Sequence, residues 1–204
     1  MHTWNKNLMN SFFYFLSLLQ KKLNYFIKFE KVEKFEKILA LDCAYKKDLA
    51  ICAAVYYDLK KDEIIKTKIE KEEVKIPYVP TFLFIREAPI MIKNYENFKN
   101  EEIDLILVDG HGLAHPRKAG IATIIGILTE KPTIGIAKSF LYGEIKDEII
   151  YVNNEKVGIK FGKYYASIGS NIDFDSLKKF LEIINFQYPK ALEIADKLSK
   201  EIKL

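Results

Sequence analysis

The feature that most constrains the fold of this chain is a short apolar run that ends in an acid. Apart from Asp104, residues 103–108 are all aliphatic, which predicts a strand buried on both faces. The run leads directly into Asp109-Gly110-His111-Gly112. A carboxylate beside glycines at the carboxyl end of a buried strand is a common place for ligand binding in open α/β sheets. The stretch therefore predicts a buried strand with a functional site at its end.

Length and composition are those of a folded domain with a substantial core. The chain has 204 residues, of which 49% are hydrophobic and 13% aromatic. We expect a single domain, 1–204, in which residues 1–37 form an N-terminal helix and a connector packed on the core. The net charge of +4 permits a nucleic-acid partner without requiring one. Cys43 and Cys52 form neither a disulfide framework nor a zinc site, so we expect reduced thiols, a cytoplasmic location and a monomer.

The apolar segment 8–19 resembles the core of a signal peptide, because it follows Lys6. Asn10 and Ser11 interrupt it, however, and it is too short to span a bilayer. Apolar residues recur at helical spacing instead, at Phe12, Leu16, Leu19, Leu23 and Phe26. This pattern favours an amphipathic helix packed on the domain over a membrane or targeting role.

The remaining pattern predicts a mixed sheet with flanking helices. Three strands with short connections indicate an antiparallel meander: 38–44, 49–58 and 63–70. A helix follows from Thr81 to Phe98, either kinked at Pro89 or beginning there. The later elements are a helix at 117–128, a parallel strand at 133–137, strand pieces at 149–152, 157–161 and 164–168, and helices at 173–184 and 189–200. We therefore expect a sheet that is antiparallel on one side and parallel on the other.

Three acids stand out on these elements: Asp42, Glu87 and Asp109. The first and fourth strands of such a sheet are commonly neighbours, which would place Asp42 beside Asp109. Two adjacent carboxylates repel one another, and a divalent cation with oxygen ligands, Mg²⁺ or Mn²⁺, removes the conflict. Each acid also has an ordinary explanation, as a turn cap, a surface helix charge or an Asp-Gly turn. The occurrence of all three on these elements favours a metal site.

Three basic residues are candidates for a second role at this site. His115 could act as an acid or base, or could hydrogen-bond a phosphate, whereas His111 could simply brace the loop. Lys138, which follows the strand 133–137, could neutralise charge that develops on a phosphate. The alternative for Lys138 is an ordinary basic residue after a strand.

At these residues the sequence resembles the endonuclease V family of inosine-directed nucleases. The resemblance is carried by Leu41-Asp42, Pro77-Tyr78-Val79-Pro80, Phe84-Ile85-Arg86-Glu87, Val108 to Arg117 with Gly120, and Gly135 to Ser139. It implies a ribonuclease-H-like, three-layer α/β fold. It also implies that Asp42, Glu87 and Asp109 hold Mg²⁺, for which Mn²⁺ can substitute, and that His115 and Lys138 assist at the phosphate.

The same resemblance implies a substrate and a binding site for it. The substrate is DNA that contains deoxyinosine, with inosine-containing RNA as a second candidate. The enzyme would cut the second phosphodiester on the 3′ side, leaving 3′-hydroxyl and 5′-phosphate ends, as a step in DNA repair. Pro77, Tyr78, Val79 and Pro80 would form a wedge whose tyrosine can stack on a base. The base pocket would comprise Thr81, Leu83, Gly110, Gly112, Gly120 and Ile121.

This interpretation has two alternatives, and the sequence departs from the family at two positions. The alternatives are another ribonuclease-H-like nuclease, cutting junctions or hybrids, and a non-catalytic module that binds inosine or nucleic acid. Many family members have glycine where this chain has Thr81, which narrows the mouth of the pocket. Many have a Gly-His pair at Gly169-Ser170, so Ser170 receives no role. Asp196 resembles a late family aspartate, but a helix-surface acid is an equal alternative, and it stays outside the predicted site.

Overall fold

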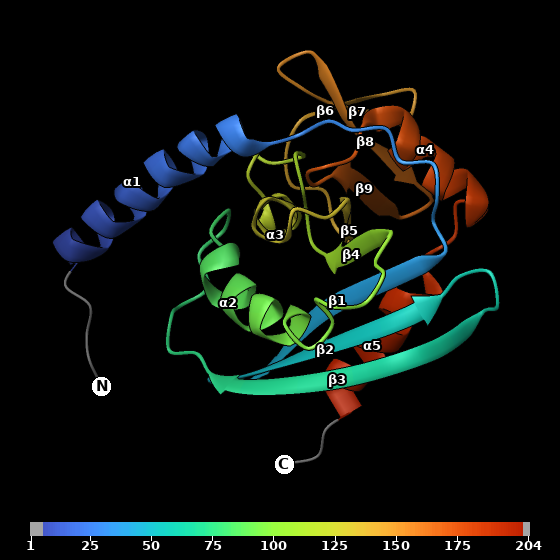
Figure 1. Ribbon diagram of the computed structural model, residues 1–204. Helices are drawn as coiled ribbons and strands as arrows, with labels where there is room; N and C mark the ends of the chain where they lie inside the picture. Colours follow the sequence, from blue (N-terminus) through green and yellow to red (C-terminus); the bar gives the residue numbers. More distant parts are fainter. Residues whose placement is uncertain (1–5, 202–204) are drawn as a thin grey trace.

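The structure is a computed structural model that describes residues 6–201, with side chains from residue 10 onward. Within that range the chain forms one mixed sheet in the order β3-β2-β1-β4-β5-β9-β8-β7-β6 (Figure 1). The strands are β1 (Lys37–Lys46), β2 (Leu49–Asp58), β3 (Glu63–Glu73), β4 (Leu105–Asp109), β5 (Thr133–Ala137), β6 (Glu144–Lys146), β7 (Ile149–Val152), β8 (Glu155–Phe161) and β9 (Tyr164–Ile168).

Helices cover both faces of this sheet. They are α1 (Lys6–Leu23), the 3-10 turn η1 (Asn24–Phe26), α2 (Phe84–Tyr95), α3 (Ile121–Thr129), α4 (Phe174–Ile183) and α5 (Lys190–Glu201). α2 and α3 pack on one face, whereas α4 and α5 pack on the other. This three-layer arrangement confirms the predicted ribonuclease-H-like class. The single domain predicted for 1–204 includes residues 1–5 and 202–204, which lie outside the described range.

The sheet differs from the prediction beyond β5. The meander β1-β2-β3 is antiparallel and the β1-β4-β5 strands are parallel, both as predicted. The expectation that the second side of the sheet is parallel holds only as far as β5, because β9 pairs with β5 in the antiparallel sense. Short hairpins then carry β8, β7 and β6 outward. The parallel strands, two of which hold Asp42 and Asp109, therefore lie in the interior of the sheet.

The two faces of β1 enter different cores. Ile38 and Ala40 pack among residues of α4 and α5, whereas Leu39 and Leu41 pack among residues of α2 and α3. Side chains alternate between the faces of a strand. The next residue on the α5 side is therefore Asp42, which the strand itself directs away from α2.

Two helices begin later than predicted. α2 begins at Phe84, and its N-cap residue Leu83 makes no side-chain cap, so Thr81 does not cap the helix. Pro89 lies inside α2. α3 begins at Ile121 rather than at residue 117. The backbone before Ile121 forms hydrogen bonds outside the helix, since the amide of Gly120 donates to the carbonyl of Gly112.

The N-terminal helix is present, but its packed face differs from the predicted one. Leu16 and Gln20 are buried, whereas Leu19 and Phe26 are 39% and 64% exposed. The C-terminal end of α1 joins the rest of the fold, and its N-terminal end extends past α2 (Figure 1). None of the helices within residues 6–201 combines the length and the apolar character needed to cross a membrane.

Candidate active site

Asp42 and Asp109 come from the two central parallel strands. The register pairs Leu41 of β1 with Val108 of β4, so the two aspartates are the next residues along neighbouring strands. Leu105 and Leu107 alternate with Asp109 and pack in the core beneath α5. Both acids are therefore directed to the α5 side of the sheet, in agreement with the predicted juxtaposition.

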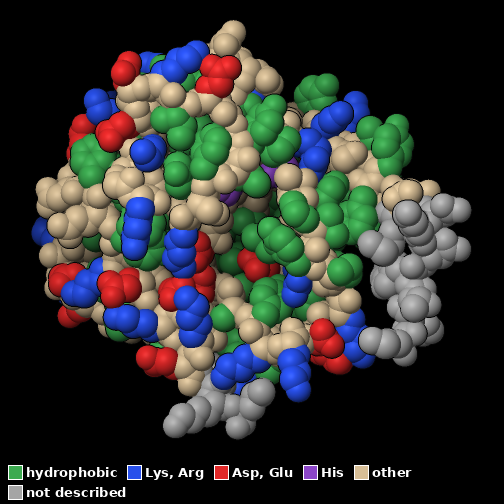
Figure 2. All heavy atoms as spheres, turned by 180° about the vertical axis from the view of Figure 1, so that it is seen from behind, with side chains coloured by type: hydrophobic (Ala, Val, Ile, Leu, Met, Phe, Trp, Pro, Cys, Tyr) green, Lys and Arg blue, Asp and Glu red, His purple; other side chains and the backbone are tan. Residues whose placement is uncertain are grey.

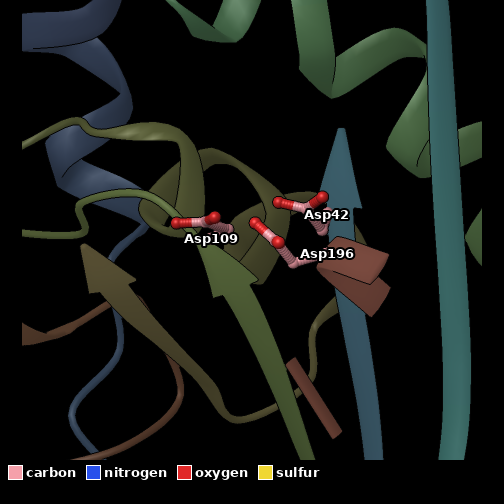
Figure 3. A group of neighbouring side chains, drawn as sticks. All are labelled: Asp42, Asp109 and Asp196. Carbon is pink, nitrogen blue, oxygen red and sulfur yellow. The ribbon is translucent and has the colours of Figure 1, made fainter. Parts of the chain in front are cut away.

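The third acid at this position is Asp196, from α5. One carboxylate oxygen from each of Asp42, Asp109 and Asp196 can be chosen so that all three lie within 4.8 Å of one another. Figure 3 shows the three side chains gathered beside β1 and the end of β4. Three carboxylates at this separation offer only hard oxygen donors, which fit Mg²⁺ or Mn²⁺ and do not fit a thiolate-binding metal.

The environment of Asp42 opposes its ionisation. The residue is only 3% exposed, and burial, followed by the neighbouring Asp109, raises the pKa of Asp42 to about 7. Two contacts oppose this rise. Ser199 Oγ donates to Asp42 Oδ2 at 2.5 Å, and the ammonium of Lys138 favours the carboxylate form. The environment of Asp42 therefore disfavours its ionisation on balance.

Glu87 approaches from the opposite layer. It lies on α2, is 7% exposed, and forms no part of the close carboxylate cluster. Burial, followed by the charges of Asp42 and Asp109, raises the pKa of Glu87 to about 8. Glu87 is thus electrostatically coupled to the aspartates, and its predicted role as a metal ligand stays a prediction.

Lys138 is the cation that the chain itself supplies to the site. Its Nζ donates to Asp109 Oδ2 and to Asp196 Oδ1, each at 2.6 Å. Burial lowers the pKa of Lys138, but these two hydrogen bonds outweigh burial, and the net shift is well above the ordinary range. Lys200 also binds Asp196, at 2.6 and 2.7 Å. The ammonium of Lys138 therefore bridges two of the three clustered acids.

A cavity of about 320 Å³ lies beside these groups. In Figure 2, histidine and acidic side chains lie within a central hollow bordered by hydrophobic side chains. The predicted catalytic residues all contribute to its wall: Asp42, Glu87, Asp109, His115 and Lys138. The predicted substrate-binding residues divide into Tyr78, Thr81, Leu83, Gly110 and Gly120, which line the cavity, and Pro77, Val79, Pro80, Gly112 and Ile121, which do not.

The two histidines differ in their free hydrogen-bonding capacity. His115 Nδ1 accepts from the amide of Arg117 at 3.2 Å, and Nε2 contacts the carbonyl oxygen of Thr81 at 3.0 Å. This fixes a neutral tautomer, and burial lowers the pKa of His115 to about 4. His111 Nε2 contacts the carbonyl oxygen of Ser139 at 2.8 Å, while its buried Nδ1 has no partner among the described residues. A direct role of His115 at phosphate would therefore require it to exchange an existing bond.

Glycine is required in this loop for packing of the backbone. A Cβ atom on Gly112 would lie 2.0 Å from the carbonyl oxygen of Ile168, and one on Gly120 would lie 2.2 Å from that of His111. Backbone atoms of the protein occupy the space where a side chain on Gly112 or Gly120 would lie, so the absence of these side chains does not enlarge the cavity. Gly112 therefore acts by seating the loop against β9.

Three residues of the site were not predicted from the sequence to have a role in it: Gln20, Asp196 and Ser199. A signal for the last two exists in α5, where the buried residues Leu192, Ala195 and Ser199 recur at helical spacing. Asp196 lies beside this inward face. Gln20 gave no such signal, because its only distinction is a polar side chain within an apolar helix.

Comparison with known proteins identifies relatives over nearly the whole chain. The model of the Endonuclease V family matches residues 19–197. Endonuclease V of Sulfolobus acidocaldarius is 49% identical over 195 residues, covering 93% of this chain and 95% of that protein. Endonuclease V of Sulfurisphaera tokodaii is 46% identical over 197 residues, covering 89% and 96%.

Solved structures share the fold. The endonuclease V of Ciona intestinalis, in complex with a 24mer DNA containing an inosine followed by a ribo-adenosine, superposes with a TM-score of 0.83 at 21% identity, covering 94% of this chain and 97% of that one. The endonuclease V of Streptomyces avermitilis gives 0.78 at 25% identity, covering 90% and 89%.

Proposed function

Since this chain belongs to the endonuclease V family of nucleases, we propose that it is a metal-dependent endonuclease that cuts nucleic acid beside a deaminated adenine. The proposed substrate is DNA containing deoxyinosine, with inosine-containing RNA as a second substrate. The proposed cut is at the second phosphodiester 3′ to the lesion, leaving 3′-hydroxyl and 5′-phosphate ends for DNA repair. The observation that carries the proposal is the cluster of Asp42, Asp109 and Asp196 oxygens, all within 4.8 Å, beside a cavity.

The proposed metal ligands are Asp42, Asp109 and Glu87, of which Glu87 approaches from the α2 side of the sheet. We add Asp196, because one of its carboxylate oxygens lies in the same cluster as those of Asp42 and Asp109. A bound Mg²⁺ or Mn²⁺ would polarise the phosphoryl oxygen and lower the pKa of a water molecule. Burial and mutual repulsion raise the pKa values of Asp42 and Glu87. A bound divalent cation would offset both effects by favouring the ionised carboxylates, so these residues fit such an ion.

The protein supplies the remaining parts of the proposed reaction. Glu87, buried beside the aspartates, would orient the attacking water and accept its proton. Lys138, released from Asp109 and Asp196, would stabilise the negative charge that develops on the phosphate. As the water oxygen bonds to phosphorus, the bond between phosphorus and the 3′ oxygen would break, and that oxygen would keep its sugar and take up a proton from solvent to end as a hydroxyl. The base stays attached to its sugar throughout, so the activity is that of a nuclease.

The proposed wedge is the segment 77–80. Tyr78 is 61% exposed and also lines the cavity, so its ring is accessible to a base. A ring on a loop stiffened by two prolines loses little freedom when it replaces a missing base neighbour, and such stacking contributes about 1–3 kcal/mol.

The test is a cleavage assay with matched substrates. With Mg²⁺, the protein should nick an oligonucleotide at the second phosphodiester 3′ to a single deoxyinosine and leave the adenine control intact. Asp109→Asn should bind the inosine strand and lower cleavage by more than about a hundredfold. Asp147→Asn, an exposed hairpin residue with φ +49 that asparagine tolerates, is the control and should cleave normally. A protein that cuts no inosine substrate with any divalent metal would contradict the proposal.

A further inference from the structure

The side chain of Gln20 is fully buried although it lies on the outermost helix, α1. A buried amide is costly unless its donors and acceptor are satisfied. Gln20 Nε2 donates to the carbonyl of Ala119 at 2.8 Å and to that of Thr81 at 3.2 Å. Gln20 Oε1 accepts from Arg117 Nε at 2.6 Å. One side chain therefore joins the N-terminal helix to two separate loops of the cavity wall.

Thr81 needs such support, because its backbone has φ +69. A β-branched residue rarely adopts this left-handed conformation and keeps it only where its surroundings enforce it. The carbonyl oxygen of Thr81 is contacted by three donors, from Gln20, His115 and Arg117, at 3.2, 3.0 and 2.9 Å. Arg117 Nη2 also donates to Thr81 Oγ1 at 2.5 Å. These contacts hold both the carbonyl and the side chain of Thr81.

The held residue connects the exposed segment 77–80 to the cavity. The amide of Phe82 closes a turn onto the carbonyl of Val79 at 3.0 Å. The ring of Phe82 packs against Phe13 of α1, with centroids 5.0 Å apart, and under the guanidinium of Arg117 at 4.3 Å. Gln20 and Thr81 both line the cavity, as do the catalytic acids. Movement of Thr81 would therefore displace the wedge and the cavity wall together.

We propose that Gln20 is a positioning residue for base recognition, which acts by clamping Thr81 in its left-handed conformation. This inference rests on the proposed function, because it assigns the cavity wall beside Thr81 to the flipped base. It makes α1 a part of the recognition machinery. Its effect falls on binding and discrimination of the lesion, since the hydrogen bonds of Gln20 go to Thr81, Ala119 and Arg117 and not to the clustered aspartates.

The decisive variant is Gln20→Leu, which keeps the volume and removes all three hydrogen bonds. We expect KM for the inosine strand to rise about tenfold, as for the loss of one or two neutral hydrogen bonds, with kcat within about twofold of the original. Gln20→Glu, which retains the acceptor for Arg117 and loses both donated bonds, should change KM in the same direction. In a Thr81→Gly background the penalty of Gln20→Leu should shrink, because glycine adopts φ +69 without support.

The matched control is Asn94→Leu. Asn94 is an equally buried amide that donates to the carbonyls of Cys52 and Lys68, away from the cavity. The Asn94→Leu variant should lower the melting temperature, as Gln20→Leu does, but should leave KM for the inosine strand unchanged. A purely structural role for Gln20 would make the two variants alike.

Hydrogen exchange of the free protein tests the clamp without cleavage. Gln20→Leu should accelerate exchange of the Phe82 amide about tenfold, and Asn94→Leu should leave it unchanged. Unchanged KM and unchanged Phe82 exchange in Gln20→Leu would overturn the clamp, as would equal changes in Asn94→Leu. If the wild-type protein cleaves no inosine strand, the proposed function fails, and the exchange result alone decides the clamp.

Discussion

Ser199 donates its hydroxyl to Asp42, with 2.5 Å between Oγ and Oδ2. The bond favours the ionised form of a buried carboxylate and lowers the pKa of Asp42, against the larger effect of burial. It also fixes the direction of one Asp42 oxygen relative to Asp109 and Asp196. The last helix therefore contributes to the site both an acid and the residue that orients another acid.

Ser199→Ala should weaken divalent metal binding by about 10- to 100-fold, the usual effect of losing a hydrogen bond to a ligand. The measurement is calorimetric titration of Mg²⁺ and Mn²⁺ at pH 7. Ser17→Ala is the matched control, because Ser17 is a helix serine whose Oγ donates to the carbonyl of Tyr14, three residues earlier, and not to an acid. Equal metal affinity in Ser199→Ala and the wild type would show that the bond has no role in the site.

The metal-free protein should lose stability as pH rises from 6.5 to 8. The pKa of Glu87 is raised from its ordinary 4.5 to about 8, and that of Asp42 from 3.8 to about 7, by burial first and by neighbouring acids second. In this window the folded state holds protons that the unfolded state has released, so stability falls with pH. The pKa of His115, lowered to about 4 by burial, has the opposite effect, but only below about 6.5.

The measurement is the melting temperature in a chelator, which we expect to fall by roughly 3 °C per pH unit. Glu87→Gln should reduce the slope, and Asp147→Asn should not. Added Mg²⁺ should flatten it, because the ion binds the deprotonated carboxylates. A melting temperature that rises across this window would contradict the electrostatic description of the site.

Much of this site follows from sequence, and the reasons are local. The aliphatic run before Asp109 and the alternation through Asp42 depend only on strand geometry, so the two acids could be placed on neighbouring strands. Asp196 could not be assigned, because the docking of α5 depends on packing across the whole sheet. The predicted start of α3 at residue 117 is also wrong, because the backbone amides of residues 117–120 form hydrogen bonds with His115 and Gly112 instead of a helical turn. The antiparallel pairing of β9 with β5 likewise depends on residues that are distant in the sequence.

Lys138→Met should separate metal binding from catalysis. The ammonium bridges Asp109 and Asp196 at 2.6 Å, so it competes with a metal ion for the same oxygens. Its removal should increase Mg²⁺ affinity and lower the cleavage rate by about 10²- to 10³-fold. Lys197→Met, which removes an exposed pair with Glu193, should change neither. Weaker metal binding in Lys138→Met would show that the ammonium supports the metal rather than competing with it.

His115 should remain neutral throughout the working pH range. Both of its ring nitrogens have backbone partners, and burial lowers its pKa to about 4. His115→Gln should therefore raise KM through the displaced Thr81 loop and leave the pH profile of kcat unshifted. His111→Ala serves as the comparison, because His111 retains a buried Nδ1 without a partner in the described part of the chain. If the His115→Gln variant loses one of the pH-dependent changes in kcat that the wild type shows, His115 acts as an acid or base after all.

The position of Asp196 on α5 has a consequence during synthesis. Asp42 and Asp109 leave the ribosome first, and a chain at that stage contains two of the three clustered acids without the helix that packs over them. Asp196 and Ser199 follow about 90 residues after Asp109. A nascent chain therefore lacks the complete carboxylate cluster until α5 has been translated and has docked, so the proposed metal-dependent cleavage would be withheld from partly made molecules.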